Sequence, residues 1–187
     1  SGINIFFLLS FSLFVLSFLI FLIIYVPRFE YIQSRILSFF DRDDATHNFQ
    51  SEKAIESITS GGFFGKGIGE GVLKNRVPEA HTDYIISVIS EEFGVVAIIL
   101  ILLLFLVFIY MVFKKINFEK SEKIKLALIG CISLILMQAT IHIGVNIRLF
   151  PTTGMTLPFL SYGGSSIVSI SILSGIILNL TKRKINY

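Results

Sequence analysis

The chain has 187 residues, of which 53% are hydrophobic, and it carries a formal net charge of +3. Its mean hydropathy of +0.79 excludes an ordinary soluble domain, in which an apolar core is balanced by a solvated polar surface. The positive charge does not indicate a nucleic-acid partner, because many of the lysines and arginines lie in two short segments that flank apolar runs. The composition therefore predicts an all-α integral membrane protein.

Four charge-free runs are each long enough to cross a bilayer. They cover residues 3–26, 93–113, 126–147 and 155–180. At about 1.5 Å per residue, each can span a hydrocarbon core of roughly 30 Å. Backbone polar groups in lipid must be paired internally, and helices achieve this. We therefore predict four transmembrane helices, at about 3–26, 84–113, 125–147 and 159–180.

The basic segments predict the orientation of these helices. Lysines crowd the connection at 114–124, and Lys182, Arg183 and Lys184 crowd the tail. Both segments fall on one side of an up-and-down bundle, and that side is cytoplasmic by the positive-inside rule. Both chain ends are then cytoplasmic. The long connection at 27–83 becomes an extracytoplasmic loop.

This long loop is predicted to be partly helical. Phe29, Ile32, Ile36 and Phe39 recur at helical spacing, which indicates a helix that lies in the membrane interface or packs on the spans. A second helix is expected to begin near Ser51 and to end at the two glycines at 61–62.

A glycine-rich segment at 62–71 follows. Its glycine density predicts tight turns, and it lacks both the strand and the Gly-Lys-Ser/Thr sequence of a P-loop. Lys66 lies within it, and Lys74 and Arg76 follow closely. These cations favour an anionic ligand such as a phosphate group. Both interpretations remain open at this stage.

The run at 76–92 brings six ionisable side chains to the mouth of a predicted span. Asp83, Ser87 and Glu91 are spaced i, i+4, i+8, so a helix beginning at Thr82 or Asp83 would carry them on one stripe. Glu91 would then lie roughly 12 Å deeper than Asp83. Ionisable groups at membrane depth usually have a function. The Asp83 carboxylate suits a general base, a ligand for a divalent cation, or a helix cap.

Other side chains near this run allow two further interpretations. His81, together with Asp83 and His47, is a candidate metal site, although the spacing matches no standard zinc motif, so the metal stays unassigned. Glu91 and Glu92 are candidates either for pairing with cations from neighbouring spans or for a direct role.

The start of the last span is broken. Pro158 and the pair Gly163-Gly164 prevent a regular helix, which leaves backbone groups that need a protein-lined or wet setting. A helix beginning at Gly164 would direct its N–H groups, beside Ser165 and Ser166, at an anion. Close helix packing through small residues is the alternative.

Two polar residues of the third predicted span share one helix face. Gln138 and His142 lie one turn apart in an otherwise apolar run. Their predicted role is interhelical hydrogen bonding.

Two motifs resemble those of the SEDS family, whose members include FtsW, RodA and SpoVE. The first is Pro78-Glu-Ala-His-Thr-Asp-Tyr with the later Glu91-Glu-Phe-Gly, and the second is Pro151-Thr-Thr-Gly followed by Leu157-Pro-Phe-Leu-Ser-Tyr-Gly-Gly-Ser-Ser. Gln50 and the segment at 65–71 resemble the region before them. The resemblance implies the last four of ten spans, and Pro78-Glu-Ala is closer to FtsW than to RodA.

The resemblance implies a peptidoglycan glycosyltransferase that polymerises lipid II at the outer face of the bacterial plasma (inner) membrane during cell division. A class b penicillin-binding protein and other division proteins would be its partners. Asp83 matches the aspartate regarded as catalytic. We expect Mg or Mn as a candidate cation. Substrate-binding residues are expected at Lys66, Lys74, Arg76, Gln50, His81, Ser165 and Ser166, with structural roles for Glu91, Glu92, Pro158, Gly163 and Gly164.

Two other functions remain as alternatives. A lipid II flippase or transporter is supported by the discontinuous last span and by Glu91. A non-catalytic division scaffold would leave Asp83 dispensable. The chain departs from the family at 41–44, where relatives often carry Asp-Pro-Trp-x-Asp, and at Tyr84, where Phe is usual. It begins with Ser-Gly and lacks six spans, so we expect a carboxy-terminal part whose activity by itself is left open.

Overall fold

A computed structural model of the protein describes residues 4–40, 45–77 and 80–182. It divides into two compact units, residues 1–48 and 49–187. Several residues of interest lie outside the described part. These are the departure at 41–44, the tail cations Arg183 and Lys184, the motif residues Pro78 and Glu79, and the side chain of His47.

The first unit contains α1 (Ile5–Tyr25), a short 3₁₀ turn (Pro27–Phe29) and α2 (Glu30–Phe40). Asn4 begins α1 by accepting a hydrogen bond from the Phe6 N–H through its side chain, at 3.1 Å. No residue of α1 is buried, although nearly all are apolar. A helix that is apolar on every face suits a lipid environment. The predicted amphipathic helix is present as α2.

The remaining helices are α3 (Ala45–Gly61), α4 (Leu73–Arg76), α5 (Ala80–Asp83), α6 (Ile85–Phe118), α7 (Glu122–Asn146) and α8 (Gly164–Thr181). α3 ends at Gly61, as expected, but it begins six residues before Ser51. The reason is that neither glycine nor proline lies between Ala45 and Ser51 to interrupt it. The start of α8 at Gly164 is later than the expected residue 159, because residues 151–163 form an irregular segment.

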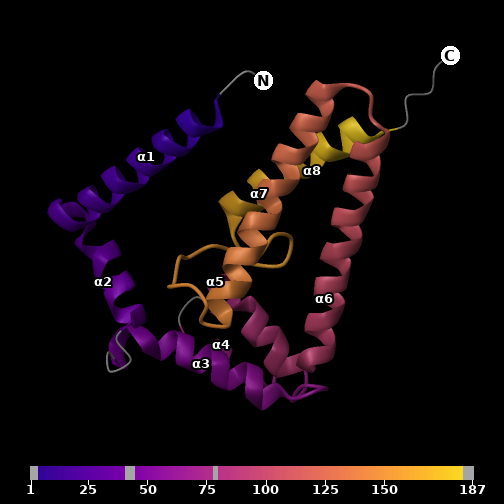
Figure 1. Ribbon diagram of the computed structural model, residues 1–187. Coiled ribbons are helices and arrows are strands. Elements are labelled where there is room, and N and C mark those ends of the chain that lie inside the picture. The colour runs from indigo at the N-terminus through magenta and orange to yellow at the C-terminus, as the bar shows by residue number, and fades with distance from the viewer. Residues whose placement is uncertain (1–3, 41–44, 78–79, 183–187) are drawn as a thin grey trace. The chain divides into compact units, whose positions relative to one another are not determined.

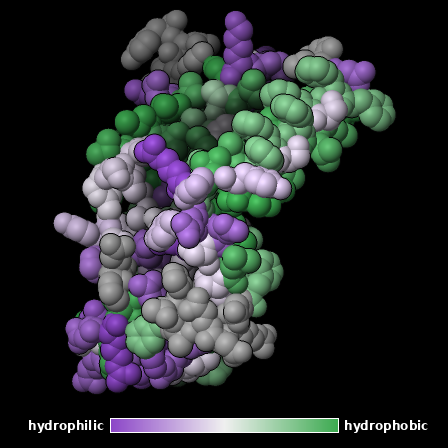
Figure 2. Space-filling view, turned by 90° about the vertical axis from the view of Figure 1, so that its left-hand side faces the viewer, coloured by the Kyte–Doolittle hydropathy of each residue, from purple (hydrophilic) through white to green (hydrophobic). Residues whose placement is uncertain are grey.

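Among the described residues, four helices are long and apolar enough to cross a membrane, namely α1, α6, α7 and α8. This confirms the predicted class, an all-α membrane protein. α7 packs against both α6 and α8 (Figure 1). The apolar core between them is formed by Val112, Ile116, Leu128, Ile132, Ile135, Ile170 and Ile177. Hydrophilic side chains gather at the end of the molecule that contains α3 (Figure 2).

α6 is divided by a sharp bend at Gly94. This residue has φ 78° and ψ −177°, a conformation that is essentially restricted to glycine. The two arms, residues 85–93 and 95–118, meet at the lower end of α6 in Figure 1, and both run upward from the bend. The prediction of one unbroken helix with Glu91 deeper than Asp83 is therefore wrong, because the short arm leads from Glu91 back toward α5.

The glycine-rich loop after α3 pairs with backbone groups of both helix ends that meet at the bend. The Lys66 and Gly67 N–H groups donate to the Glu91 and Glu92 carbonyls, at 2.8 and 3.1 Å. On the long arm, the Val95 N–H donates to the Gly62 carbonyl at 2.9 Å. Helix ends otherwise leave such groups unpaired, which is costly next to lipid. The loop thus acts as a cap for two helix ends, which agrees with the tight-turn interpretation.

Three glycines allow this close approach of loop and helix. A Cβ atom on Gly61 would overlap the Ser90 carbonyl, one on Gly65 the Glu92 carbonyl, and one on Gly94 the Phe63 carbonyl. Because each neighbour is backbone, it cannot move aside without breaking the cap. The glycine density of the sequence is therefore explained by packing at the bend.

Gly94→Ala should lower the free energy of unfolding of the detergent-solubilised protein by at least about 1–3 kcal/mol, the cost of a strained backbone conformation. Gly175→Ala is the matched control, because Gly175 lies inside α8 with open space around it. That control should be neutral or stabilising by up to about 1 kcal/mol. Equal thermal stability of the two variants would contradict the proposed role of the bend.

Candidate functional site

Asn146, the last residue of α7, lies at the centre of the candidate site. It is fully buried, and its side-chain oxygen accepts hydrogen bonds from the Ser87 N–H at 3.2 Å and the Ser87 hydroxyl at 2.8 Å. Its amide nitrogen donates to the carbonyls of Asp83, at 3.0 Å, and His142, at 2.9 Å. This one side chain therefore joins α7 to the short arm of α6 and to the end of α5.

Asp83 is the last residue of α5 and is partly exposed. α6 begins two residues later, with Tyr84 in the N-cap position. A Cβ atom on Gly154 would lie 3.7 Å from one Asp83 carboxylate oxygen, so the backbone of the irregular segment runs beside the carboxylate. Gly154 has φ +69°, which glycine adopts without strain. The two family motifs thus meet at Asp83.

The irregular segment at 151–163 is fastened to the residues just before Asp83. The Ser161 hydroxyl donates to the Thr82 carbonyl at 2.7 Å and accepts from the Leu157 N–H at 2.8 Å. The Tyr162 N–H donates to the His81 carbonyl at 3.2 Å. The His81 and Tyr162 rings lie 5.9 Å apart. The segment therefore forms one wall of the site.

Two polar residues of α7 hold the irregular segment in place through hydrogen bonds. Gln138 donates to the Thr156 carbonyl at 2.9 Å and to the Ser166 hydroxyl at 3.1 Å, and Thr156 also bonds Ser166 at 2.6 Å. His142 bonds the Met155 carbonyl through Nδ1 at 2.7 Å. The predicted interhelical hydrogen bond is present for Gln138, whose partner Ser166 belongs to α8, whereas His142 bonds the irregular segment and not another helix. Ser166 is engaged in this network, whereas Ser165 is exposed at the start of α8.

The acidic pair at the bend binds one lysine of the glycine-rich loop and one lysine of α4. Glu91 is 2% exposed, and its carboxylate accepts from Lys66 Nζ at 2.8 Å. The Val72 and Leu73 N–H groups donate to its other oxygen, at 3.1 and 3.0 Å. Glu92 pairs with Lys74 at 3.0 Å. These cations come from the loop and from α4, and not from neighbouring spans.

A polar pocket of about 190 Å³ lies between α3, the loop and α4. Lys66 and Arg76 line it, together with Lys53 and Glu56. A hydrogen bond from Lys53 holds the pKa of the Glu56 carboxyl below its usual value. The structure thus separates the predicted site residues. His81, Asp83 and Ser166 adjoin the irregular segment, Lys66 and Arg76 line the polar pocket, and Gln50 is partly exposed on α3.

The predicted metal site is not assembled within the described part of the chain. There, no three side chains of His, Cys, Asp or Glu are grouped as metal ligands. His47, the third ligand proposed from the sequence, has its side chain outside the described residues.

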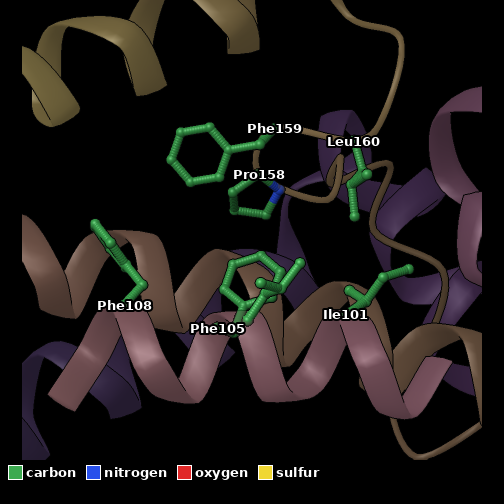
Figure 3. A pocket seen from close by; sticks show the side chains of 7 residues that line it. Ile101, Phe105, Phe108, Pro158, Phe159 and Leu160 are labelled. Carbon is green, nitrogen blue, oxygen red and sulfur yellow. The ribbon is translucent and has the colours of Figure 1, made fainter. Parts of the chain in front are cut away.

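An apolar groove of about 300 Å³ borders the irregular segment (Figure 3). Phe105 and Phe108 of α6 form one side, and the turn at Pro158, Phe159 and Leu160 forms the other. Phe159 has φ +68°, an uncommon conformation for a bulky residue, and one that often marks a functional position. Ser161 links this turn to Thr82, so the groove wall and Asp83 belong to one hydrogen-bonded unit.

Sequence reasoning missed three contributors to this site: Asn146, Ser161 and Phe159. Asn146 carried a usable signal, because it is a polar residue inside a charge-free run and such residues usually face protein. No sequence signal identified the conformation of Phe159 or the partner of Ser161.

Comparison with known proteins identifies the family. Residues 1–186 match the family described as "Cell cycle protein", FtsW/RodA/SpoVE. The chain therefore belongs to this family, and the resemblance seen in its motifs is confirmed.

Named relatives agree with this assignment. "Probable peptidoglycan glycosyltransferase FtsW" of Caulobacter vibrioides is 40% identical over 83% of this chain and 40% of its own length. Its namesake in Geobacter metallireducens is 34% identical over 95% of this chain and 47% of its own length. A solved structure named "Structural coordination of polymerization and crosslinking by a peptidoglycan synthase complex" matches with a TM-score of 0.68 and 28% identity, over 92% of this chain and 47% of that one. The chain thus spans less than half the length of these relatives.

The contacts of Glu91 predict that it matters more for stability than its neighbour. Glu91→Ala would leave the Val72 and Leu73 N–H groups without their acceptor, at about 1–3 kcal/mol for each, and would remove the ion-pair partner of Lys66. We expect a loss of about 3 kcal/mol or more in the free energy of unfolding. The control Glu92→Ala removes a more exposed ion pair and should cost about 1 kcal/mol or less. Denaturant titration measures both values, and the reverse order would contradict this assignment.

Proposed function

We propose that this chain is the carboxy-terminal part of a peptidoglycan glycosyltransferase that polymerises lipid II during cell division. The observation that carries the proposal is the setting of Asp83, a partly exposed carboxylate where the two family motifs meet. Asn146 and Ser161 fix the backbone on either side of it. The names of the relatives support the same reaction.

In the proposed reaction, Asp83 is the general base. It takes the proton from a hydroxyl of the acceptor sugar, and that oxygen attacks the anomeric carbon of the donor. The bond from this carbon to the lipid diphosphate breaks with inversion, and the diphosphate leaves with the electron pair. Gly154 supports this role because the absence of a side chain leaves space beside the carboxylate.

The departing diphosphate requires positive charge. Lys66, Lys74 and Arg76 remain the candidates, although Lys66 and Lys74 already pair with Glu91 and Glu92. Arg76 is exposed and lines the polar pocket, which makes it the strongest of the three. A divalent cation, Mg or Mn, would serve the same purpose. The described residues offer no ligand cluster for it, so no step is assigned to a metal.

The hydrocarbon part of a lipid-linked substrate needs an apolar surface beside the site. The groove between α6 and the Pro158–Leu160 turn offers one, with a lining of entirely apolar side chains. We propose that it receives part of the prenyl chain. Because Ser161 connects the groove wall to Thr82, the bound prenyl chain would lie at a fixed distance from the Asp83 carboxylate.

The proposed setting is the outer face of the bacterial plasma membrane, with both chain ends cytoplasmic. The orientation rests on the basic connection between α6 and α7 and on the basic tail. A class b penicillin-binding protein is the proposed partner, which is consistent with the likeness to a chain of a peptidoglycan synthase complex.

A lipid II flippase is the second candidate function. The irregular segment before α8 favours it, since transport sites often use broken helices. Against it, the buried carboxylate of Glu91 is held by Lys66 and by two N–H groups at the bend. A scaffold without enzyme activity would not require the partly exposed Asp83.

Asp83→Asn in the full-length protein, assayed with its penicillin-binding partner, should lower lipid II polymerisation at least about 10²-fold, because the base is lost. Glu70→Gln is the control, since Glu70 is an exposed carboxylate on the glycine-rich loop. It should retain activity. Thermal unfolding should be unchanged for both. Full polymerisation by the Asp83→Asn protein would exclude the proposed base, and translocation of lipid II without polymer by the parent protein would favour the flippase.

A further inference from the structure

The tip of the glycine-rich loop displays three large apolar side chains. Phe63 is 75% exposed, Phe64 85% and Ile68 80%. They lie on a segment whose backbone is fixed by hydrogen bonds to α6, so their exposure does not arise from an unanchored loop. We name these three residues the apolar tip. Neither the bend nor the candidate site uses their side chains.

Hydrogen bonds fix the level of the apolar tip along α6. The Gly62 and Phe63 carbonyls accept from the Val95 and Val96 N–H groups, at 2.9 and 3.4 Å. Between Gly94 and the first lysine after the long arm, Lys114, there are 20 residue steps. At about 1.5 Å per step this length is roughly 30 Å, the thickness of a hydrocarbon core. The loop therefore lies where the hydrocarbon region of this span begins.

The apolar tip continues the exposed apolar face of the span. Phe93, the last residue of the short arm, is 44% exposed, and Val96 and Ile99 at the start of the long arm are 50% and 56% exposed. The two nearby cations, Lys66 of the loop and Lys74 of α4, are instead directed to Glu91 and Glu92, and the remaining charged group of the loop, Glu70, is exposed. Phenylalanine and aliphatic side chains of interfacial segments insert into the boundary between headgroups and acyl chains. The loop thus exposes apolar groups beside the apolar span, while Lys66 and Lys74 bind the acidic pair.

We propose that the apolar tip inserts into the headgroup–acyl boundary of the bilayer and anchors the glycine-rich loop there. The partner is the phospholipid leaflet itself. The anchor holds the loop against the bend, and through the bend it fixes the short arm that leads to Asp83. This inference requires a membrane-spanning α6 and does not depend on the glycosyltransferase reaction.

The proposal is tested by tryptophan fluorescence, since this chain contains no tryptophan. The Phe64→Trp variant of the full-length protein is reconstituted in phosphatidylcholine vesicles whose acyl chains are brominated either near the headgroup or near the bilayer centre. The emission of the introduced tryptophan is obtained by subtracting the emission of the parent protein from that of the variant. Two controls calibrate depth: Leu103→Trp on the exposed face of α6 and Thr59→Trp on the exposed polar surface of α3.

We expect shallow bromination to reduce the Phe64→Trp emission at least twofold and deep bromination to reduce it less. Leu103→Trp should show the reverse order, and Thr59→Trp should respond to aqueous acrylamide only. The proposal is overturned if Phe64→Trp behaves like Thr59→Trp. It is also overturned if neither lipid nor acrylamide quenches the emission, because another part of the protein would then cover the tip.

Discussion

The sharp bend of α6 at Gly94 is the constraint on which the rest of the structure depends. Two helix ends meet there beside the hydrocarbon region, and their backbone groups must be paired without water. The glycine-rich loop pairs both ends, and glycines at 61, 65 and 94 let the backbones approach closely enough. The Glu91 carboxylate then binds the loop and the start of α4, because it accepts hydrogen bonds from Lys66 and from the Val72 and Leu73 N–H groups. The three glycines and the charged side chain of Glu91 therefore serve the same purpose, which is to hold the loop against the bend.

Asp83 is fixed because the short arm of α6 is held at both ends. At the bend, the loop and Glu91 hold the last residues of the arm. At the other end, Asn146 bonds Ser87 and the Asp83 carbonyl, and Ser161 bonds the preceding residue. Inside a membrane protein such hydrogen-bonded polar networks specify one arrangement, since breaking one of their bonds would leave a costly unpaired group. A carboxylate carried on a backbone held in this way suits a base that must meet its substrate in a defined geometry.

The sequence predicted what depends on composition and local pattern. Charge-free runs identified the four spans, and the pairing roles of Gln138 and His142 followed from isolated polar residues on an apolar face. The bend was missed because a single glycine in an apolar run is compatible with a continuous helix. Consequently the depth of Glu91 relative to Asp83 was predicted wrongly. The partners of Lys66, Ser161 and Asn146 were also missed, since they lie 25, 79 and 63 residues away in the sequence.

The central claim is that the two motifs form one site around the Asp83 carboxylate. An experimental structure of the full-length protein bound to an unreactive lipid II analogue tests it most directly, by the distance from the Asp83 carboxylate to the acceptor hydroxyl. The account predicts about 2.6–3.2 Å, or one bridging water, with the 151–163 segment contacting the same sugar. An acceptor bound away from Asp83, with this segment remote from it, would contradict the claim.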